Sequence, residues 1–245
     1  MHTRHRSCTA LVISQFDAQV GLALDGAALS IFDFFDTIRI INLPARTDRR
    51  REMEAELAAL GLLDDPRVRF FDGIRPRNRL DFSSVGARGV YEGHKQLLQE
   101  AAAANQSILI LEDDCAFRAD AVQYRIDEPW DIFYGGYKAA NPQNLFGSDI
   151  EMAHMMGFTA HGAQLVADYL DRLQYAGEHP PIDAAYVWFR RAHPDVATCF
   201  AVPPLAWQRS SPSDIAPKPW DRLAFTRALA ATFRKFRNQR ARRRS

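Results

Sequence analysis

The sequence predicts an α/β fold in which a mixed, mainly parallel sheet is flanked by helices. Three observations support this prediction. Short apolar runs recur along the chain, stretches with helical spacing separate them, and glycine, proline or polar residues mark the boundaries. Strands that alternate with helices over residues 38–111 indicate parallel pairing, because each helix returns the chain to the same edge of the sheet.

The first strand–helix–strand unit is the clearest. Residues 38–41 form a short β-rich apolar run, which predicts a buried strand. A helix is predicted over residues 47–60, with Thr47 as its N-cap and Gly61 as its stop. Residues 68–71 predict the second strand.

The remaining elements follow in the same way. Residues 74–86 are rich in arginine, proline, serine and glycine and predict a loop, followed by a helix over 88–104 and a fully buried strand over 108–111. Further strands are predicted at 130–134, 155–159 and 196–202, helices at 161–175 and 181–191, and a long loop at 203–219.

Length and composition suit one domain with appendages. The chain has 245 residues, 47% hydrophobic and 25% charged, which is ordinary globular usage. We predict an N-terminal extension over residues 1–35, a folded domain over 36–216 and a C-terminal tail over 217–245. The net charge of +1 argues against nucleic-acid binding, so no nucleic-acid partner is expected.

The tail is strongly basic. It holds ten Lys or Arg and one acid, and thus a charge of +9 against −8 for the rest of the chain. Its apolar stripe of helical spacing comprises Phe225, Leu229, Phe233 and Phe236. This pattern suits an anionic membrane surface, and it equally suits a helix packed on the body; RNA binding is a weaker third interpretation.

Cysteine use points to a reducing compartment. The three cysteines lie far apart and form neither a disulfide framework nor a zinc pattern. No apolar run approaches the roughly 20 residues of a membrane span, and acids interrupt the N-terminal region where a signal peptide would be apolar. We therefore expect a cytoplasmic protein, with the tail as a candidate contact to the inner face of the membrane.

Three consecutive acids follow the most apolar strand. Glu112, Asp113 and Asp114 emerge directly after residues 108–111. Clustered carboxylates repel one another, which favours a compensating cation, and oxygen ligands suit Mg²⁺ or Mn²⁺. A metal there would neutralise a diphosphate. The alternative is a solvated loop or the first turn of a helix, where acids are favoured without any ligand.

Several segments together resemble glycosyltransferase family 25, the lipopolysaccharide and collagen galactosyltransferase group. The resemblance covers residues 36–216, and its order and spacing are more specific than any single motif. The matching segments are Ile41-Asn42-Leu43 with Arg46, Asp48, Arg49 and Met53; Gly86 to His94; Ile110-Leu111-Glu112-Asp113-Asp114; Trp130-Asp131; Pro181-Ile182-Asp183; and Gln208 with Ser213-Asp214-Ile215.

The resemblance implies a GT-A fold, a nucleotide-sugar donor and metal-dependent transfer with inversion. Galactose from a UDP-sugar and a cell-surface glycan such as lipopolysaccharide, or a lipid-linked precursor, are the default donor and acceptor. The chain departs from the family at Gly93, where a serine usually precedes His94.

The resemblance and the chemistry of the side chains together suggest roles for individual residues. Asp114 is the best metal ligand, with Glu112 as a second ligand or a ribose contact. Arginine forks suit phosphate oxygens, although Arg46 and Arg49 could also be ordinary helix surface charge. The predicted donor-binding set is Asn42, Arg46, Arg49, Asp72, His94, Glu112, Asp113, Gln208 and Ser213.

Inverting transfer also needs a general base for the acceptor hydroxyl. We predict Asp183, which opens a helix after two prolines, with Asp131 and Asp214 as rivals. Two other functions stay open: a metal-dependent phosphohydrolase that uses the same acids, and a catalytically degenerate module that binds a membrane surface.

Overall fold

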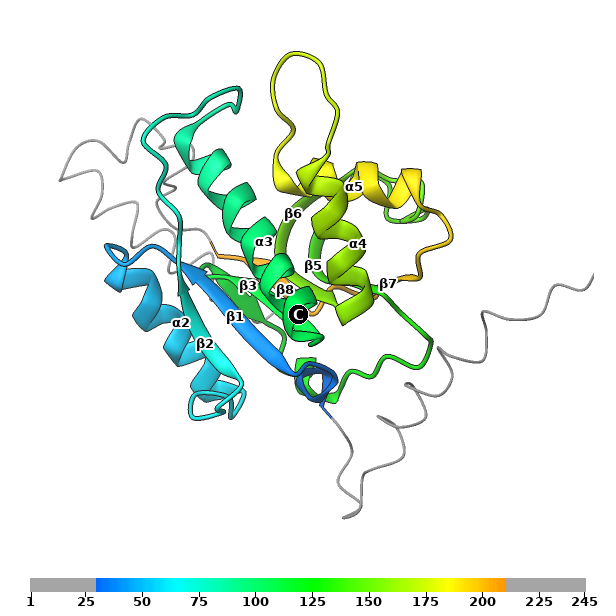
Figure 1. Ribbon diagram of the computed structural model, residues 1–245. Coiled ribbons are helices and arrows are strands. Elements are labelled where there is room, and N and C mark those ends of the chain that lie inside the picture. The colour runs from blue at the N-terminus through cyan, green and yellow to red at the C-terminus, as the bar shows by residue number, and fades with distance from the viewer. Residues whose placement is uncertain (1–29, 210–245) are drawn as a thin grey trace, which may run out of the picture.

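The structure, a computed structural model, describes residues 30–209 (Figure 1). Its helices and strands are η1 (Ile31–Phe34), β1 (Thr37–Asn42), α2 (Thr47–Ala59), β2 (Val68–Asp72), α3 (Val85–Ala104), β3 (Ile108–Glu112), β4 (Cys115–Phe117), η2 (Ala121–Gln123), β5 (Ile132–Ala139), β6 (Ile150–Phe158), α4 (Ala160–Asp171), α5 (Ile182–Ala192), β7 (Thr198–Phe200) and β8 (Ala206–Gln208).

A six-stranded sheet with the order β2-β1-β3-β6-β5-β7 forms the centre of the fold. The pairs β1–β2, β1–β3 and β5–β7 are parallel, and β6 alone runs antiparallel, between β3 and β5. A separate two-stranded sheet joins β4 and β8. The predicted class, a mixed and mainly parallel sheet flanked by helices, is confirmed.

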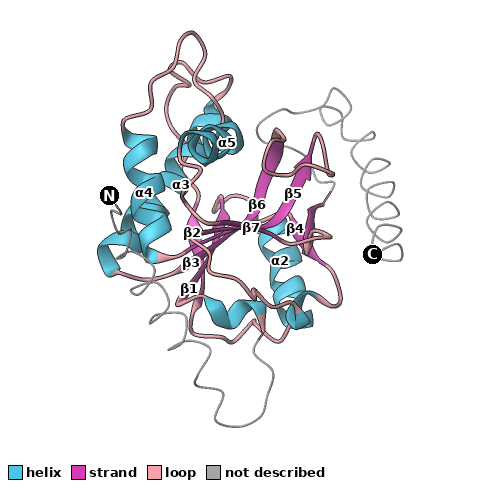
Figure 2. Cartoon of the chain, turned by 90° about the vertical axis from the view of Figure 1, so that its right-hand side faces the viewer, coloured by secondary structure: helices cyan, strands magenta, loops and turns pink. Residues whose placement is uncertain are grey.

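Helices cover both faces of this sheet (Figures 1 and 2). On one face α3, α4 and α5 pack over β3, β5 and β6 in one apolar cluster. On the other face η1 and α2 pack over β1 and β3 in a second cluster. This two-sided cover explains why residues 108–111 are all buried and all apolar.

The domain begins before the predicted boundary at residue 36. In η1, Ile31, Phe32 and Phe34 are buried, and the next residue, Phe35, is buried against Trp130 with ring centroids 5.4 Å apart. Residues 30–35 are therefore part of the fold rather than of an extension. Within residues 30–209 no helix is both long enough and apolar enough to cross a membrane. The predicted tail helix and Ser213 lie outside the described residues.

Long-range pairing changes several predicted elements. The segments 130–134 and 155–159 are parts of the long antiparallel β5–β6 hairpin, and β8 occupies the start of the predicted loop 203–219. The predicted N-cap is also wrong, because Thr47 is already helical and Arg46 is the capping residue. Helix α3 begins three residues earlier than predicted, where the Ser84 side chain accepts a hydrogen bond from the Ala87 amide.

Two glycines four residues apart on one face of α3 lie in very different surroundings, and substituting each gives a matched test. A Cβ added at Gly89 would collide with the Ile74 carbonyl oxygen, whereas one at Gly93 would lie 3.6 Å from Phe71 and 3.7 Å from Ile41. We expect Gly89→Ala to cost about 3 kcal/mol of unfolding free energy. Gly93→Ala should instead stabilise by about 0.5–1 kcal/mol, because alanine suits a helix interior better. Urea unfolding of both variants measures the difference, and equal effects would contradict this packing.

A second prediction concerns a buried histidine in β6. Burial lowers the pKa of His154 to about 4, and its Nε2 lies 3.1 Å from the Ala206 carbonyl oxygen. The unfolded chain takes up this proton below about pH 6.5, whereas the folded chain does so only near pH 4. Its contribution to stability is therefore complete above pH 6.5 and falls by up to about 1.4 kcal/mol per pH unit towards pH 4.

Replacement by glutamine, whose amide can still donate to Ala206, removes this titration. Denaturant unfolding at pH 7, 6 and 5 should show a weaker loss of stability in His154→Gln than in the wild type. Parallel curves for the two proteins would show that the His154 imidazole is not held neutral by the fold.

Candidate active site at the carboxyl ends of the strands

The order of the strands creates a topological switch point between β1 and β3. From β1 the chain passes through α2 to β2 on one side, and from β2 it passes through α3 to β3 on the other side of β1. The two crossover helices lie on opposite faces of the sheet, α2 after β1 on one face and α3 after β2 on the other. Ligands of open α/β sheets bind outside the strand ends at such a point.

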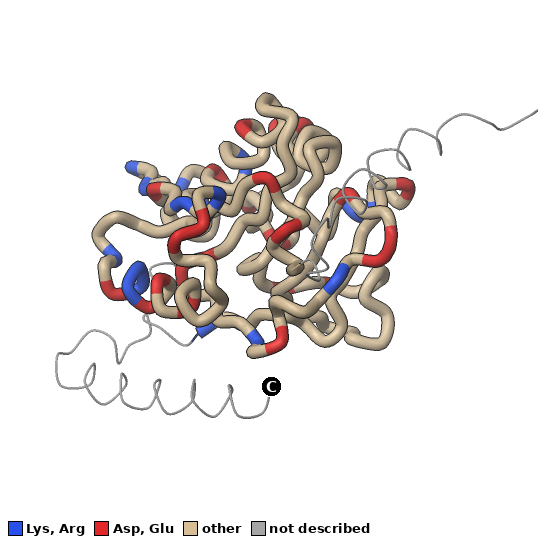
Figure 3. The backbone as a smooth tube through the Cα atoms, turned by 90° about the horizontal axis from the view of Figure 1, so that it is seen from below, with Lys and Arg blue, Asp and Glu red and all other residues tan. Residues whose placement is uncertain are grey.

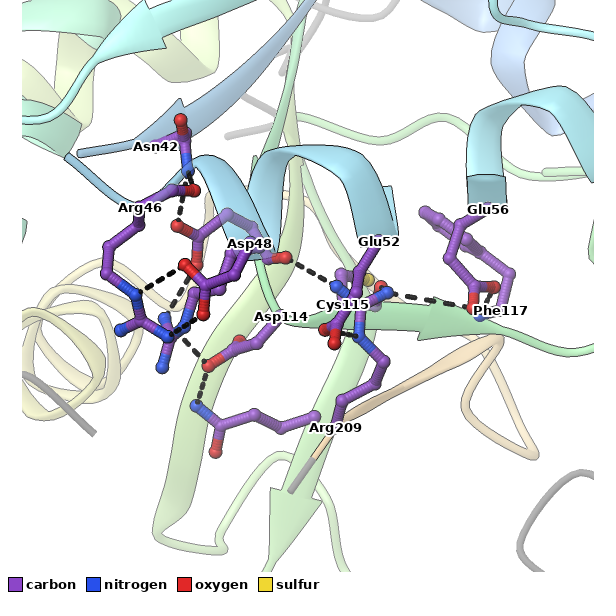
Figure 4. A network of polar contacts seen from close by, with 12 residues as sticks. Asn42, Arg46, Asp48, Glu52, Glu56, Asp114, Cys115, Phe117 and Arg209 are labelled. Atoms are coloured by element: carbon purple, nitrogen blue, oxygen red, sulfur yellow. Dashed lines mark hydrogen bonds and ion pairs between the residues drawn. The ribbon is translucent and has the colours of Figure 1, made fainter. Parts of the chain in front are cut away.

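The three acids lie at this point, and we call Glu112, Asp113 and Asp114 the acidic turn. Asp113 accepts a 2.8 Å hydrogen bond from the Asn42 amide at the end of β1 and a 2.6 Å bond from Arg49 Nη1 in α2. Asp114 lies 3.3 Å from the same Arg49 nitrogen and accepts a 3.2 Å bond from Gln208 in β8 (Figure 4). The structure thus brings together three stretches that are distant in the sequence: residues 42–49, the acidic turn and Gln208.

One oxygen of the acidic turn has no partner. Asp114 Oδ1 is buried and forms no hydrogen bond, while Oδ2 contacts Arg49 and Gln208. Burial raises the pKa of Asp114, and the Arg49 guanidinium opposes that rise. Among the described residues no three His, Cys, Asp or Glu side chains converge as a complete metal site. A cation held at this turn would therefore have to take most of its ligands from phosphate and water.

His94, in α3, lies next to the acidic turn. It is fully buried, its Nδ1 lies 2.9 Å from the Tyr186 hydroxyl of α5, and its Nε2 lies 4.0 Å from Glu112 Oε1 without a hydrogen-bond partner. Burial lowers the pKa of His94 to about 3, so its ring is neutral. Burial, followed by the charges of Asp114 and Asp113, raises the pKa of Glu112 to about 8. His94 is thus both a core residue and a neighbour of the site.

The two predicted general bases lie at opposite ends of the sheet. Asp183 is in the first turn of α5 and accepts 2.9 Å hydrogen bonds from the amides of Met152 and Ala184. Its negative charge contributes to the raised pKa of Glu112, so it lies on the side of the acidic turn. Met152, which it holds, has φ +69°, a strained conformation for a residue with a side chain.

Asp131, the other predicted catalytic residue, lies far from the acidic turn. Asp131 precedes β5, whose first residue pairs through β6 with Ile108 at the start of β3. The acidic turn begins at the other end of β3, about 13 Å away along the strand. Asp131 instead binds Thr159 and His161 of the α4 start and the amide of Ala197, so it joins three segments of the fold.

The remaining predicted residues flank the acidic turn. Arg46 forms two 2.9 Å hydrogen bonds to Asp48, which lower the pKa of that carboxyl to about 2. Asp72 is exposed at the end of β2, directly opposite Asn42 in the parallel register. Both therefore lie at the carboxyl edge of the sheet.

The sequence analysis missed Arg209 and Tyr186. Arg209 is buried and donates to the carbonyl oxygens of Asp113 and Cys115. Its place directly after Gln208 was the only signal for it. Basic and acidic segments alternate over the described chain rather than gathering on separate faces (Figure 3). The electrostatics of the acidic turn therefore depend on neighbouring ion pairs rather than on a charged face of the molecule.

Comparisons with known proteins give fold similarities alone. No protein-family model and no curated protein matches the chain. A glycosyltransferase involved in glycosylation of the major capsid of PBCV-1 has a TM-score of 0.47 at 11% identity, covering 81% of this chain and 98% of that one. A putative glucose-1-phosphate thymidylyltransferase from Bacillus anthracis has a TM-score of 0.41 at 11% identity, covering 80% and 76%. Because both scores are below 0.5, the fold assignment depends on this chain's own strand order and pairing.

Proposed function

We propose that this chain is a metal-dependent, inverting glycosyltransferase that uses a nucleotide-sugar donor. The observation that carries the proposal is the buried, unpartnered Oδ1 of Asp114 at the switch point between β1 and β3. A buried carboxylate oxygen without a partner is costly, so it indicates a site for a cation or a donor group. Arg49, Asn42 and Gln208 around it supply the polar contacts that a nucleoside diphosphate requires.

Each residue of the proposed donor side has a separate role. Asp114 would hold Mn²⁺ or Mg²⁺, with Glu112 as second ligand, and the bound metal would neutralise the diphosphate leaving group. Arg49 and Arg46 at the start of α2 would bind the phosphate oxygens. Asn42 and Asp72, paired across β1 and β2, suit the nucleoside.

The proposed acceptor side contains Asp183. Its carboxylate receives two backbone N–H groups, which fix its orientation at the first turn of α5. In the proposed reaction Asp183 takes the proton of the acceptor hydroxyl as that oxygen bonds to the anomeric carbon and the bond to the diphosphate breaks. His94, whose Nδ1 lies within hydrogen-bond distance of the Tyr186 hydroxyl, lies 4.0 Å from Glu112.

The resemblance to glycosyltransferase family 25 narrows the proposal to galactose from UDP-galactose and to a cell-surface glycan such as lipopolysaccharide. Gly93, which replaces the family's serine, has room for a Cβ. Packing therefore does not explain why glycine replaces serine here. The replacement removes a hydroxyl group from the site. A cytoplasmic enzyme with its basic tail on an anionic membrane would meet a lipid-linked acceptor there.

Product analysis separates this proposal from its rivals. The full chain is incubated with UDP-galactose and other nucleotide sugars, with and without Mn²⁺ and lipopolysaccharide. Metal-dependent release of nucleoside diphosphate, increased by the acceptor, supports the proposal. Release of inorganic phosphate without any acceptor would indicate a phosphohydrolase. Binding to anionic vesicles without any nucleotide turnover would indicate a degenerate membrane module.

A further inference from the structure

Arg209 binds three consecutive carbonyl oxygens of the acidic turn and the strand after it. Its backbone N–H donates to Asp114 O at 2.6 Å, its Nη2 to Asp113 O at 2.6 Å and its Nη1 to Cys115 O at 2.9 Å. Figure 4 shows Arg209 beside Asp114 and Cys115. The peptide planes on both sides of Asp114 are therefore held by a single residue.

The charge of Arg209 is balanced from α2. Its Nε lies 3.4 Å from Glu52 Oε2, and its Nη1 lies 3.6 Å from Glu56 Oε1. Residues 49, 52 and 56 lie at helical spacing on one face of α2, so Arg49 shares that face. Helix α2 thus contacts the carboxylates of the acidic turn directly, through Arg49. It contacts the backbone of the turn indirectly, through Arg209, which pairs with Glu52 and Glu56.

This arrangement restricts where the acidic side chains can point. A turn is adjusted by rotating its peptide planes. Rotation of the Asp113 or Cys115 carbonyl would break a charge-assisted hydrogen bond to a guanidinium that is only 7% exposed, and rotation of the Asp114 carbonyl would break the bond from the Arg209 backbone N–H. Preorganised ligands bind more tightly, because the cost of ordering them is met during folding. A purely structural brace would lower stability when removed, yet it would leave the ligand affinity of the folded protein unchanged.

We infer that Arg209 is a positioning residue for the donor site: it fixes the peptide planes of the acidic turn so that Asp114 presents its free oxygen to the metal–diphosphate group. This inference rests on the proposed function. Lysine at this position keeps the charge but lacks the planar fork that spans two carbonyl groups.

Calorimetric binding of UDP in the presence of Mn²⁺ tests the inference in the full chain. We expect Arg209→Gln to weaken UDP affinity at least tenfold and Arg209→Lys to give an intermediate affinity. Arg118→Gln is the matched control, because Arg118 makes a comparable two-bond pair, to Asp120 at 2.8 and 2.7 Å. The control should bind UDP within twofold of the wild type.

The possible outcomes are separable. If the Arg209 variants melt earlier yet bind UDP as the control does, the positioning role is overturned. Should Arg209→Gln fail to fold, Arg209→Lys decides alone. If the wild type does not bind UDP with Mn²⁺, the proposed function fails, and amide hydrogen exchange then tests positioning: the Arg209 variants should exchange at least tenfold faster over residues 113–117, and unchanged exchange would refute it.

Discussion

Asp114→Asn is expected to lose at least a hundredfold in metal-dependent sugar transfer while the fold stays intact. Asparagine keeps the shape of the side chain, and its amide oxygen can still accept from Gln208. It lacks the negative charge that a divalent metal requires, and the metal's contribution to such transfers is several kcal/mol. Because burial raises the pKa of Asp114, the fold already opposes its charge, and a neutral residue should not lower the melting temperature.

Transfer rates and Mn²⁺-dependent UDP affinity, measured together with the melting temperature, check this expectation. Asp120→Asn is the control, because Asp120 is an exposed acid paired with Arg118 away from the acidic turn. It should leave transfer unchanged. Full activity in Asp114→Asn would show that the Asp114 carboxylate does not hold a catalytic metal.

The same substitution at Asp183 and Asp131 should give opposite results. Asp183→Asn removes the proposed base, so kcat is expected to fall about 10²- to 10⁴-fold with little change in UDP affinity. Asp131→Asn should keep kcat within a fewfold of the wild type and lower stability instead, because Asp131 joins Thr159, His161 and Ala197 at the far edge of the sheet.

Pre-steady-state transfer rates and thermal melts of both variants measure these effects. A normal kcat in Asp183→Asn would show that Asp183 is not the general base. Loss of kcat in a well-folded Asp131→Asn would contradict the placement of the site at the carboxyl edge.

Much of the donor side could be predicted from local sequence. A run of four apolar residues buried between two helical layers identifies β3, and the acids directly after it must emerge at its carboxyl end. Asn42 is the last residue of β1, and parallel pairing of β1 with β3 brings the two carboxyl ends together. The structure places Asn42, Arg49, Asp113, Asp114 and Gln208 in contact with one another, while their role in donor binding stays a prediction.

Placements that depend on long-range pairing could not be predicted from the sequence. A short motif containing Asp131 does not reveal whether it precedes or follows its strand. That placement is fixed by β6, which runs antiparallel between β3 and β5 and sets their register. Arg209 was missed for a similar reason. Its contacts are to backbone carbonyls 94 to 96 residues away, and backbone groups leave no trace in the sequence.

The most direct test of the central claim is a thermal-shift screen of nucleotide sugars, with and without Mn²⁺, on the wild type and on Asp114→Asn. Ligands that bind only the folded chain raise its melting temperature. We predict that one UDP-sugar stabilises the wild type only when Mn²⁺ is present, and that Asp114→Asn shows no such response. No shift with any nucleotide, or an equal shift in the variant, would contradict a metal-dependent donor site at the acidic turn.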